Sequence, residues 1–176
     1  SENSFNQAPL SVLTSRPYLL FVGAFEERKN VLRLLKSFAK VKSQLLGHEL
    51  ILVGKGGLLS EMKDIISSLS LEQDVRILSQ LQSDDLPAYY QGATALLYPS
   101  LFEGFGLPIV EALMSETLVM TSLGSCFPES AGPGAFFIDP YQEESMAQTL
   151  IDIVNLSSEE RLKRITLGLE HCKKFH

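Results

Sequence analysis

Residues 100–111 read Ser-Leu-Phe-Glu-Gly-Phe-Gly-Leu-Pro-Ile-Val-Glu. The apolar, partly β-prone residues 93–98 before this run predict a strand, and residues 107–114, with proline in the first turn, predict a helix. In a parallel sheet such a junction lies at the carboxyl edge of the strands, where the amides of a new helix can meet an anion or a hydroxyl. Gly104 and Gly106 allow a ligand to approach the backbone closely. The segment therefore predicts an α/β fold with a binding loop.

Two carboxylates belong to this segment, Glu103 in the loop and Glu111 one turn into the helix. A carboxylate accepts two hydrogen bonds side by side, which suits the paired hydroxyls of a ribose or a pyranose. Taken alone, each acid is better explained as a capping or helix-terminal charge, because the first turns of helices attract acids. The complete run reverses that preference and favours a binding role for both.

Outside this segment, short apolar runs alternate with amphipathic stretches. Strands are expected at 19–22, 50–53, 75–78, 95–98, 118–121 and 135–138, and helices at 31–41, 58–69, 86–90, 107–114, 143–156 and 158–172. Asp84 and Asp85 are expected to cap the third helix. Repeated strand–helix units require a parallel sheet with helices on both faces. The fold class is α/β, with a doubly wound, Rossmann-like parallel sheet in a single domain at 17–176, after a linker or domain-crossing segment at 1–16.

Composition restricts the classes of partner. A chain of 176 residues that is 45% hydrophobic and 20% charged is typical of one globular domain, and its net charge of −6 argues against a nucleic-acid surface. No apolar stretch is long enough to cross a bilayer and no signal peptide opens the chain, so a cytoplasmic location is expected. Cys126 and Cys172 lack companions at metal-ligand spacing, which predicts free thiols and no metal site.

Arg28 and Lys29 follow a predicted strand and the turn at Gly23. A phosphate group would arrive at this position, and two cations there could neutralise a diphosphate. If the diphosphate were a leaving group, contacts that strengthen as its charge develops would lower the barrier. The residues alone leave open a second interpretation, in which these are exposed loop charges balanced by Glu26 and Glu27.

Several of these segments resemble those of one family, the group 1 retaining glycosyltransferases of the GT-B architecture. Residues 100–112 resemble the family's E-G-F-G-L-P-x-x-E-A signature, and residues 18–30 resemble its strand, glycine turn and R-K-N segment. Residues 49–56 resemble its second strand and turn, and residues 122–130 resemble a later loop that follows a strand. Pro128-Glu129 to Gly132 and Asp139-Pro140 resemble its late landmarks. The likeness spans about residues 17–156. It implies the C-terminal, donor-binding half of a GT-B enzyme.

The resemblance implies residue roles. Arg28 and Lys29 would hold the donor diphosphate beside Gly23, Glu103 would hold the sugar, and Glu111 the ribose hydroxyls. The sugar and its phosphate would also meet the loop and its amides, which are contributed by Gly104, Phe105, Gly106 and Leu107. The family's catalytic apparatus would then be Glu103, Arg28 and Lys29, and retention would proceed by attack on the face that the leaving group departs from. No metal or other cofactor is expected.

The resemblance also implies partners. The substrates would be a nucleoside-diphosphate sugar and a carbohydrate or lipid-linked acceptor used in polysaccharide biosynthesis, with no nucleic acid. The Arg-Lys-Asn version of the first motif favours a GDP-mannose type of donor. An acceptor-binding N-terminal domain is missing, so the isolated chain is expected to be inactive. Apart from the resemblance, five cations allow peripheral membrane contact of the full-length protein, although a solvated helix face is the favoured interpretation: Arg161, Lys163, Arg164, Lys173 and Lys174.

The sequence also bears on two other function classes. A dinucleotide or ATP site is disfavoured, because neither Gly54-Lys55-Gly56-Gly57 nor Gly104-Phe105-Gly106 completes a dinucleotide fingerprint and no phosphate-loop pattern occurs. The turn at 54–57 is instead expected to link a strand to a helix. A non-enzymatic nucleotide or carbohydrate sensor that kept the donor pocket stays open. An upstream βα-rich domain would favour the enzyme, and a regulatory module the sensor.

Overall fold

The computed structural model describes residues 15–175; the expected linker residues 1–14 and His176 lie outside this part. Six strands form one sheet in the order β3-β2-β1-β4-β5-β6, and every neighbouring pair is parallel. Their bounds are β1 Tyr18–Val22, β2 Glu49–Val53, β3 Val75–Leu78, β4 Ala95–Tyr98, β5 Leu118–Ser122 and β6 Phe136–Ile138. The predicted α/β class with a doubly wound parallel sheet is confirmed.

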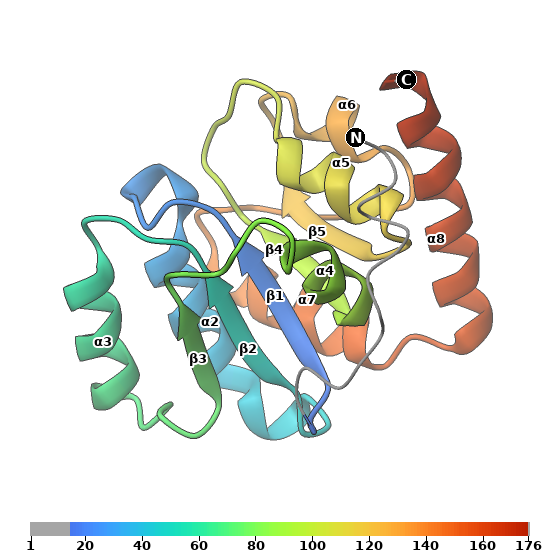
Figure 1. Ribbon diagram of the computed structural model, residues 1–176. Coiled ribbons are helices and arrows are strands. Elements are labelled where there is room, and N and C mark those ends of the chain that lie inside the picture. Colours follow the sequence, from blue (N-terminus) through green and yellow to red (C-terminus); the bar gives the residue numbers. More distant parts are fainter. Residues whose placement is uncertain (1–14, 176) are drawn as a thin grey trace.

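Helices cover both faces of the sheet (Figure 1). One layer contains α2 (Val31–Val41), α3 (Leu59–Ser68) and α7 (Glu143–Val154). The other contains α4 (Leu86–Gly92), α5 (Leu107–Met114), α6 (Phe127–Ala131) and α8 (Ser158–Cys172). Short 3-10 turns are η1 (Glu27–Lys29), η2 (Lys42–Gln44) and η3 (Lys173–Phe175). Within residues 15–175 we find no helix with the length and apolarity that a membrane crossing requires.

The strands divide their side chains between two cores. In β1, Leu19 and Phe21 pack with the α2 layer, whereas Tyr18 and Leu20 pack with the α5 layer. The same alternation continues in β2, β4 and β5, because successive strand side chains point to opposite faces. The strands read as nearly continuous apolar runs since both faces are covered, as expected for a buried parallel sheet.

The strand order reverses direction between β1 and β4, which are neighbours in the sheet although far apart in the chain. The loops that leave their carboxyl ends are joined directly. The amide of Leu101 donates to the carbonyl of Arg28 at 2.8 Å, and Asn30 Nδ2 donates to the carbonyl of Pro99 at 3.0 Å. Ligands of doubly wound folds bind at such a switch point. The topology therefore places the residues after β1 and β4 at one ligand-binding edge.

Two local predictions were wrong. The expected loop at 122–130 contains the start of α6, a five-residue helix with Pro128 in its first turn. It is too short to show a helical period in the sequence. Asp85 stands at the N-cap position of α4, but its side chain makes no capping hydrogen bond. Its backbone is already helical (φ −87°, ψ −21°), whereas a capping side chain normally acts from an extended residue.

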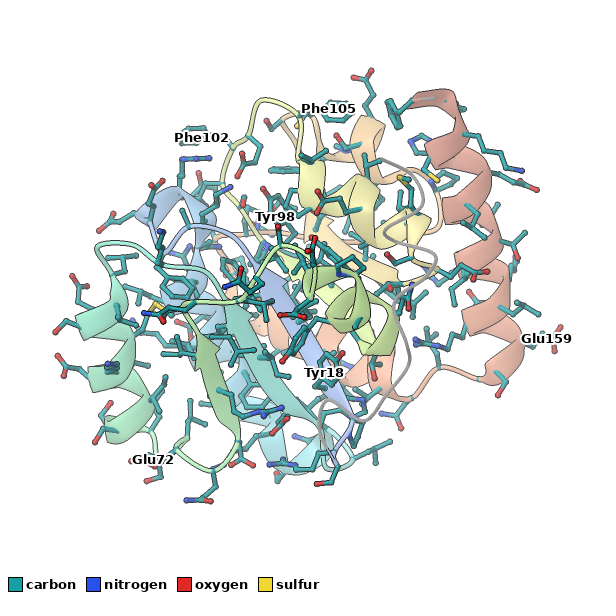
Figure 2. The ribbon with its side chains drawn as sticks, in the orientation of Figure 1. Tyr18, Glu72, Tyr98, Phe102, Phe105 and Glu159 are labelled. Atoms are coloured by element: carbon teal, nitrogen blue, oxygen red, sulfur yellow. The ribbon has the colours of Figure 1, made fainter. Side chains whose placement is uncertain are left out.

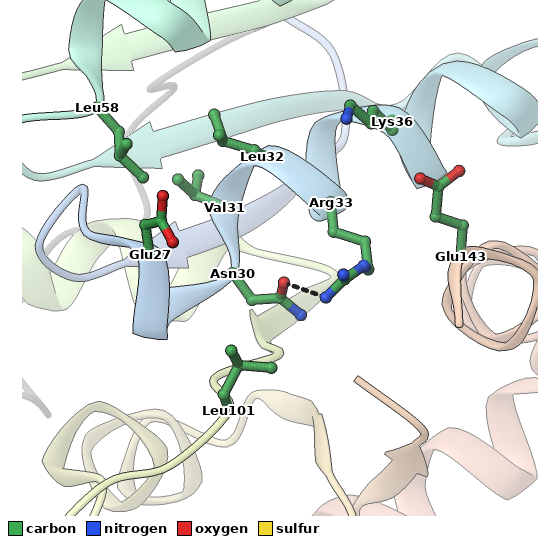
Figure 3. A pocket seen from close by; sticks show the side chains of 9 residues that line it. All are labelled: Glu27, Asn30, Val31, Leu32, Arg33, Lys36, Leu58, Leu101 and Glu143. Carbon is green, nitrogen blue, oxygen red and sulfur yellow. Dashed lines mark hydrogen bonds between the residues drawn. The ribbon is translucent and has the colours of Figure 1, made fainter. Parts of the chain in front are cut away.

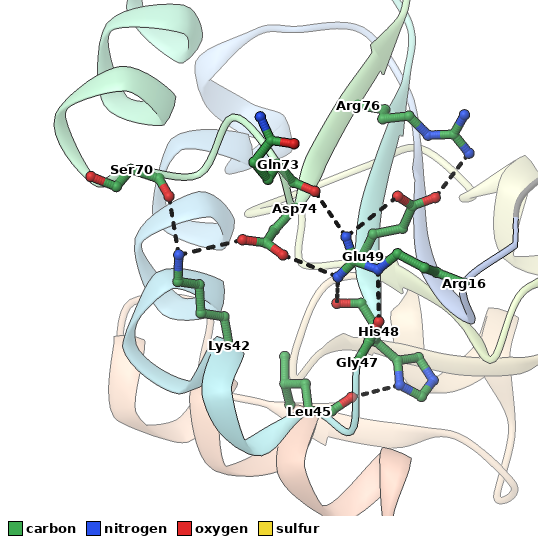
Figure 4. A network of polar contacts seen from close by, with 10 residues as sticks. All are labelled: Arg16, Lys42, Leu45, Gly47, His48, Glu49, Ser70, Gln73, Asp74 and Arg76. Atoms are coloured by element: carbon green, nitrogen blue, oxygen red, sulfur yellow. Dashed lines mark hydrogen bonds and ion pairs between the residues drawn. The ribbon is translucent and has the colours of Figure 1, made fainter.

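Arg16 closes the amino edge of the sheet (Figure 4). Its guanidinium donates to the carbonyls of Gly47 at 3.0 Å and Gln73 at 2.8 Å, and to Asp74 Oδ1 at 3.0 Å. Lys42 reaches the other oxygen of Asp74 at 3.4 Å. These bonds tie the chain entering β1 to the segments that enter β2 and β3. The network is structural and lies at the opposite edge from the switch point.

The two cysteines match their prediction as free thiols. Cys172 is buried at the end of α8 and Cys126 is half-buried before α6. Neither forms a disulfide.

Candidate functional site

Arg28, Lys29 and Glu103 meet at the switch point. The two cations come from η1 after β1, and the carboxylate comes from the loop after β4. Arg28 Nη1 lies 3.0 Å from Glu103 Oε2, and Lys29 Nζ donates to Glu103 Oε1. The carboxylate therefore receives one cation on each oxygen, an arrangement of charge-assisted hydrogen bonds. The structure brings together the three residues that the sequence singled out for chemistry.

Tyr98, the last residue of β4, completes this cluster. Its hydroxyl donates to Glu103 Oε1 at 2.9 Å and accepts from Lys29 Nζ at 3.0 Å. The ring is almost fully buried (Figure 2). Burial by itself raises the pKa of Glu103, but hydrogen bonds from Lys29 and Tyr98, with the charge of Lys29, lower that pKa below its usual value. Burial and then the bond to Glu103 raise the pKa of Tyr98. Glu103 is thus held as an ionised acceptor.

The two cations of the cluster differ in their exposure to solvent. Lys29 is 7% exposed, while 37% of the Arg28 side chain faces solvent, where its Nε also lies 3.3 Å from the exposed Glu26. The pKa of Arg28 is raised, chiefly by its hydrogen bond to Glu103. Gly23 lies against the same lysine, because a β-carbon there would sit 3.6 Å from Lys29 Cδ. Glu103 and Glu26 together balance the two cations, and an anion that arrives at this edge would compete with the exposed Glu26 for Arg28.

The loop from Gly104 to Leu107 leads directly into α5. Gly106 is its N-cap and has φ +84°, a left-handed conformation that favours glycine. Of the first three residues of α5, Pro108 has no N–H and the amide of Ile109 donates to the carbonyl of Gly106 at 3.0 Å. The amide of Leu107, at the first helical position, has no acceptor within the helix and is the one suited to an anion or a hydroxyl. The loop is held from outside: Ser130 Oγ donates to the carbonyl of Phe105, and the Phe105 ring packs edge-on against Phe175 at 5.2 Å.

Glu111 lies apart from the cation cluster and has its own tyrosine. The hydroxyl of Tyr90 in α4 donates to Glu111 Oε2 at 2.9 Å. Burial raises the pKa of Glu111, and this hydrogen bond opposes the rise. Tyr90 and Tyr98 both belong to the core between the sheet and α5. The site therefore contains two tyrosine–glutamate pairs, one held by cations and one without them.

Replacing Glu111 by glutamine is expected to raise the free energy of unfolding at pH 7. Burial raises the folded-state pKa above the unfolded value of about 4.3, so ionisation costs stability as pH rises through the folded pKa. The gain should be present at pH 7 and absent below about pH 4. Urea unfolding at both pH values measures it, with Glu72→Gln as a control at an exposed carboxyl. A lower free energy of unfolding for Glu111→Gln than for the wild type at pH 7 would contradict a raised pKa of Glu111 in the folded state.

A cavity of about 280 Å³ lies beside these residues without including them (Figure 3). It opens at the start of α2 and is lined by Glu27, Asn30, Val31, Leu32, Arg33, Lys36, Leu58, Leu101 and Glu143. Its two acids and two cations balance, and Arg33 is engaged by Asn30 at 2.8 Å. We therefore locate the site by the charge cluster. Among the described residues, no group of three or more His, Cys, Asp or Glu side chains is arranged to hold a metal ion.

Of the five cations weighed for membrane contact, Arg164 serves the fold. Its Nε lies 3.1 Å from Glu160 Oε1, and its guanidinium stacks 3.8 Å from the centroid of the Phe136 ring. It also donates to the carbonyls of Gly134 and Ala135. These contacts join α8 to β6 and to the two residues before it.

Sequence reasoning missed the tyrosines. The sequence patterns place Tyr98 in a strand and Tyr90 in a helix and indicate no partner for either hydroxyl. A signal was present for Tyr98: it ends an otherwise aliphatic strand, and a buried phenol needs a hydrogen-bond partner at that edge. Tyr90 and Phe175 gave no such signal, because their partners come from elements that only the tertiary fold brings near.

Comparison with known proteins decides the family. Residues 3–167 match the family described as Glycosyl transferases group 1. The chain belongs to the group 1 glycosyltransferases. This group 1 chain is 29% identical over 160 residues to the O-antigen chain mannosyltransferase B of Escherichia coli. The alignment covers 90% of this chain and 42% of that protein. It therefore spans less than half the length of that relative.

Solved structures locate the group 1 chain within the GT-B fold. The C-terminal domain of a group 1 family protein (LpcC) from Francisella tularensis matches with a TM-score of 0.77 at 18% identity, covering 90% of this chain and 87% of that one. Anabaena HepE, solved in complex with UDP and glucose, matches with a TM-score of 0.80 at 18% identity over 90% of this chain and 44% of that chain. The predicted family and the fold of its C-terminal domain are confirmed.

Proposed function

We propose that residues 17–176 form the donor-binding half of a retaining glycosyltransferase that moves a hexose from a nucleoside-diphosphate sugar to a hydroxyl acceptor. The observation that carries the proposal is the convergence of Arg28 and Lys29 on Glu103 at the switch point of the sheet. Family membership supports the reaction class.

The charges suit a departing diphosphate. When the bond between the sugar and the diphosphate breaks, negative charge accumulates on the phosphate oxygens. Arg28 is partly exposed, and the ammonium of Lys29 donates to the hydroxyl of Tyr98. Both cations can strengthen their contacts with the phosphate oxygens as that charge grows. Contacts that are stronger in the transition state than in the ground state accelerate the reaction. The two cations would then act on the leaving group and need no help from an acid.

The remaining residues are proposed to bind the rest of the donor. Glu103 would accept hydroxyls of the sugar, since cations and Tyr98 keep it ionised. The amides at 105–107 would meet the sugar and its phosphate at the start of α5. Glu111 would accept the ribose hydroxyls.

A mannose donor with a guanine base is the finer proposal. It is supported by the Arg-Lys-Asn motif and by the mannosyltransferase named among the relatives. The UDP complex of the structurally similar Anabaena protein makes uridine the main alternative base. The whole protein would add an acceptor-binding domain for a carbohydrate or lipid-linked acceptor, and this half alone would bind the donor with negligible turnover.

Calorimetric titration of the chain with GDP, UDP and ADP tests the proposal without knowledge of the acceptor. We expect selective binding, with GDP preferred. The double variant Arg28→Ala, Lys29→Ala should lose at least about tenfold in affinity, because hydrogen bonds to charged groups contribute about 1.5–3 kcal/mol each. The pair Lys40→Ala, Lys63→Ala removes the same charge from exposed positions on α2 and α3 and should bind normally.

Two outcomes would contradict the proposal. Binding that survives loss of both Arg28 and Lys29 would remove the diphosphate from this cluster. Failure of all three nucleotides to bind would contradict the assignment of the donor site to this half of the enzyme.

A further inference from the structure

Tyr90 is buried beneath Glu111 and is fixed from several directions. Its ring is fully buried in the core between the sheet and α5. Its carbonyl accepts from Thr117 Oγ1 at 2.5 Å and from the amide of Ala93 at 3.2 Å. The position of the Tyr90 ring is therefore fixed by its packing and by its backbone contacts, and its hydroxyl donates to Glu111 Oε2 at 2.9 Å.

Glu111 is held at one oxygen and exposed to a ligand at the other. The residue is half-buried in the middle of α5, and within residues 15–175 its Oε1 has no hydrogen-bond donor. The last torsion of a glutamate side chain is broad, so an unsupported carboxylate rotates freely. A hydrogen bond on Oε2 limits that rotation and leaves both lone pairs of Oε1, with one of Oε2, for other donors.

We propose that Tyr90 is a positioning residue that holds the Glu111 carboxylate in the orientation required to accept the two ribose hydroxyls of the donor nucleotide. The inference rests on the proposed function, which assigns the ribose to Glu111, and adds the residue that pre-orders it. A carboxylate already fixed by Tyr90 loses less freedom when the diol binds, so the affinity is higher. The hydroxyl also opposes the effect of burial and so favours the ionised, purely accepting form of Glu111.

A role confined to stability is the alternative, and the ribose separates the two. Tyr90→Phe removes the hydroxyl and keeps the buried ring. If the hydroxyl positions Glu111, affinity for GDP falls about fivefold, the equivalent of one hydrogen bond of about 1 kcal/mol. Affinity for 2′,3′-dideoxy-GDP, which has no ribose hydroxyls, is unchanged. If the hydroxyl only stabilises the fold, both nucleotides respond alike.

The experiment is a titration of the chain and its variants with GDP and 2′,3′-dideoxy-GDP, and in parallel with UDP and its dideoxy analogue. Tyr18→Phe is the matched control: it removes another buried phenol hydroxyl, which donates to the carbonyl of Tyr89 at 2.7 Å. It should leave the ratio of the two affinities as in the wild type. Urea unfolding of each variant checks that the fold is retained.

The outcomes separate the two proposals. A ribose-dependent loss in Tyr90→Phe that is absent in Tyr18→Phe supports the positioning role. Equal losses for both nucleotides, or no loss, overturn that role while the wild-type titration leaves the proposed function standing. Equal binding of GDP and its dideoxy analogue by the wild type removes the ribose from Glu111 and the positioning role with it. Failure of the wild type to bind any nucleotide overturns the proposed function itself.

Discussion

Glu103→Gln is expected to lower the free energy of unfolding by about 2–3 kcal/mol at neutral pH, because removing one partner of a buried ion pair leaves the other uncompensated. Lys29 is that partner: it is 7% exposed, and its remaining contact would be the hydroxyl of Tyr98 at 3.0 Å. The amide of glutamine still accepts a hydrogen bond but carries no charge. Arg28 loses less, because its side chain reaches solvent.

The loss should depend on pH in a defined direction. The folded-state pKa of Glu103 lies below its unfolded value, which is about 4.3. Its contribution to stability is therefore fully present above the unfolded pKa and disappears as pH falls through the folded pKa. Urea unfolding from pH 7 down to pH 3 should show the wild type and Glu103→Gln converging only in the acidic range.

The same variant should separate sugar binding from diphosphate binding. In the proposed site Glu103 accepts sugar hydroxyls, so the extra affinity for GDP-mannose over GDP should disappear in Glu103→Gln. Affinity for GDP itself should be retained, because Arg28 and Lys29 remain. Glu26→Gln is the matched control, since Glu26 also faces Arg28 but is 53% exposed at the side chain. It should change the unfolding free energy by less than about 1 kcal/mol. Wild-type stability together with a preserved preference for GDP-mannose in Glu103→Gln would contradict both assignments.

The architecture was predictable because local patterns and sheet geometry agree. β3, β4 and α8 occupy the residue ranges expected from apolar runs and amphipathic spacing. Parallel pairing followed from alternation of strands and helices, which leaves few other topologies. The start of α6 escaped prediction because five residues are too few to express a helical period.

The part of the candidate site that follows the carboxyl ends of the strands was predictable from the sequence. Arg28, Lys29 and Glu103 were expected at one edge, and the loops after β1 and β4 do meet there. The contacts of Tyr90 and Tyr98 were not predictable in the same way, because they depend on the packing of α4 and β4 against α5. The roles of these residues toward a donor stay predictions, which the titrations above address.

Gly54→Ala is expected to cost about 3 kcal/mol or more in unfolding free energy, beyond the ordinary range of overpacking, because its neighbour is backbone. Gly54 has φ +154°, and a β-carbon there would lie 1.9 Å from the carbonyl oxygen of Gly23. The turns after β1 and β2 lie side by side at this point, and the amide of Gly54 donates to the carbonyl of Leu78 at 3.1 Å. Glycine is therefore required at position 54 for the two turns to come this close, and this requirement does not extend to Gly57.

Gly57→Ala is the matched control within the same turn. A β-carbon at Gly57 meets nothing within 4 Å, and the residue is exposed. It should unfold like the wild type, whereas Gly54→Ala should melt about 10 °C lower, at roughly 2–4 °C per kcal/mol for a chain of this size. Because Gly23 lies against Lys29, the displaced turn should also weaken GDP binding in Gly54→Ala protein that remains folded. Equal melting temperatures for the two variants would mean that the turn after β1 moves away from the added methyl group without loss of stability. The short distance to Gly23 would then not explain why glycine stands at position 54.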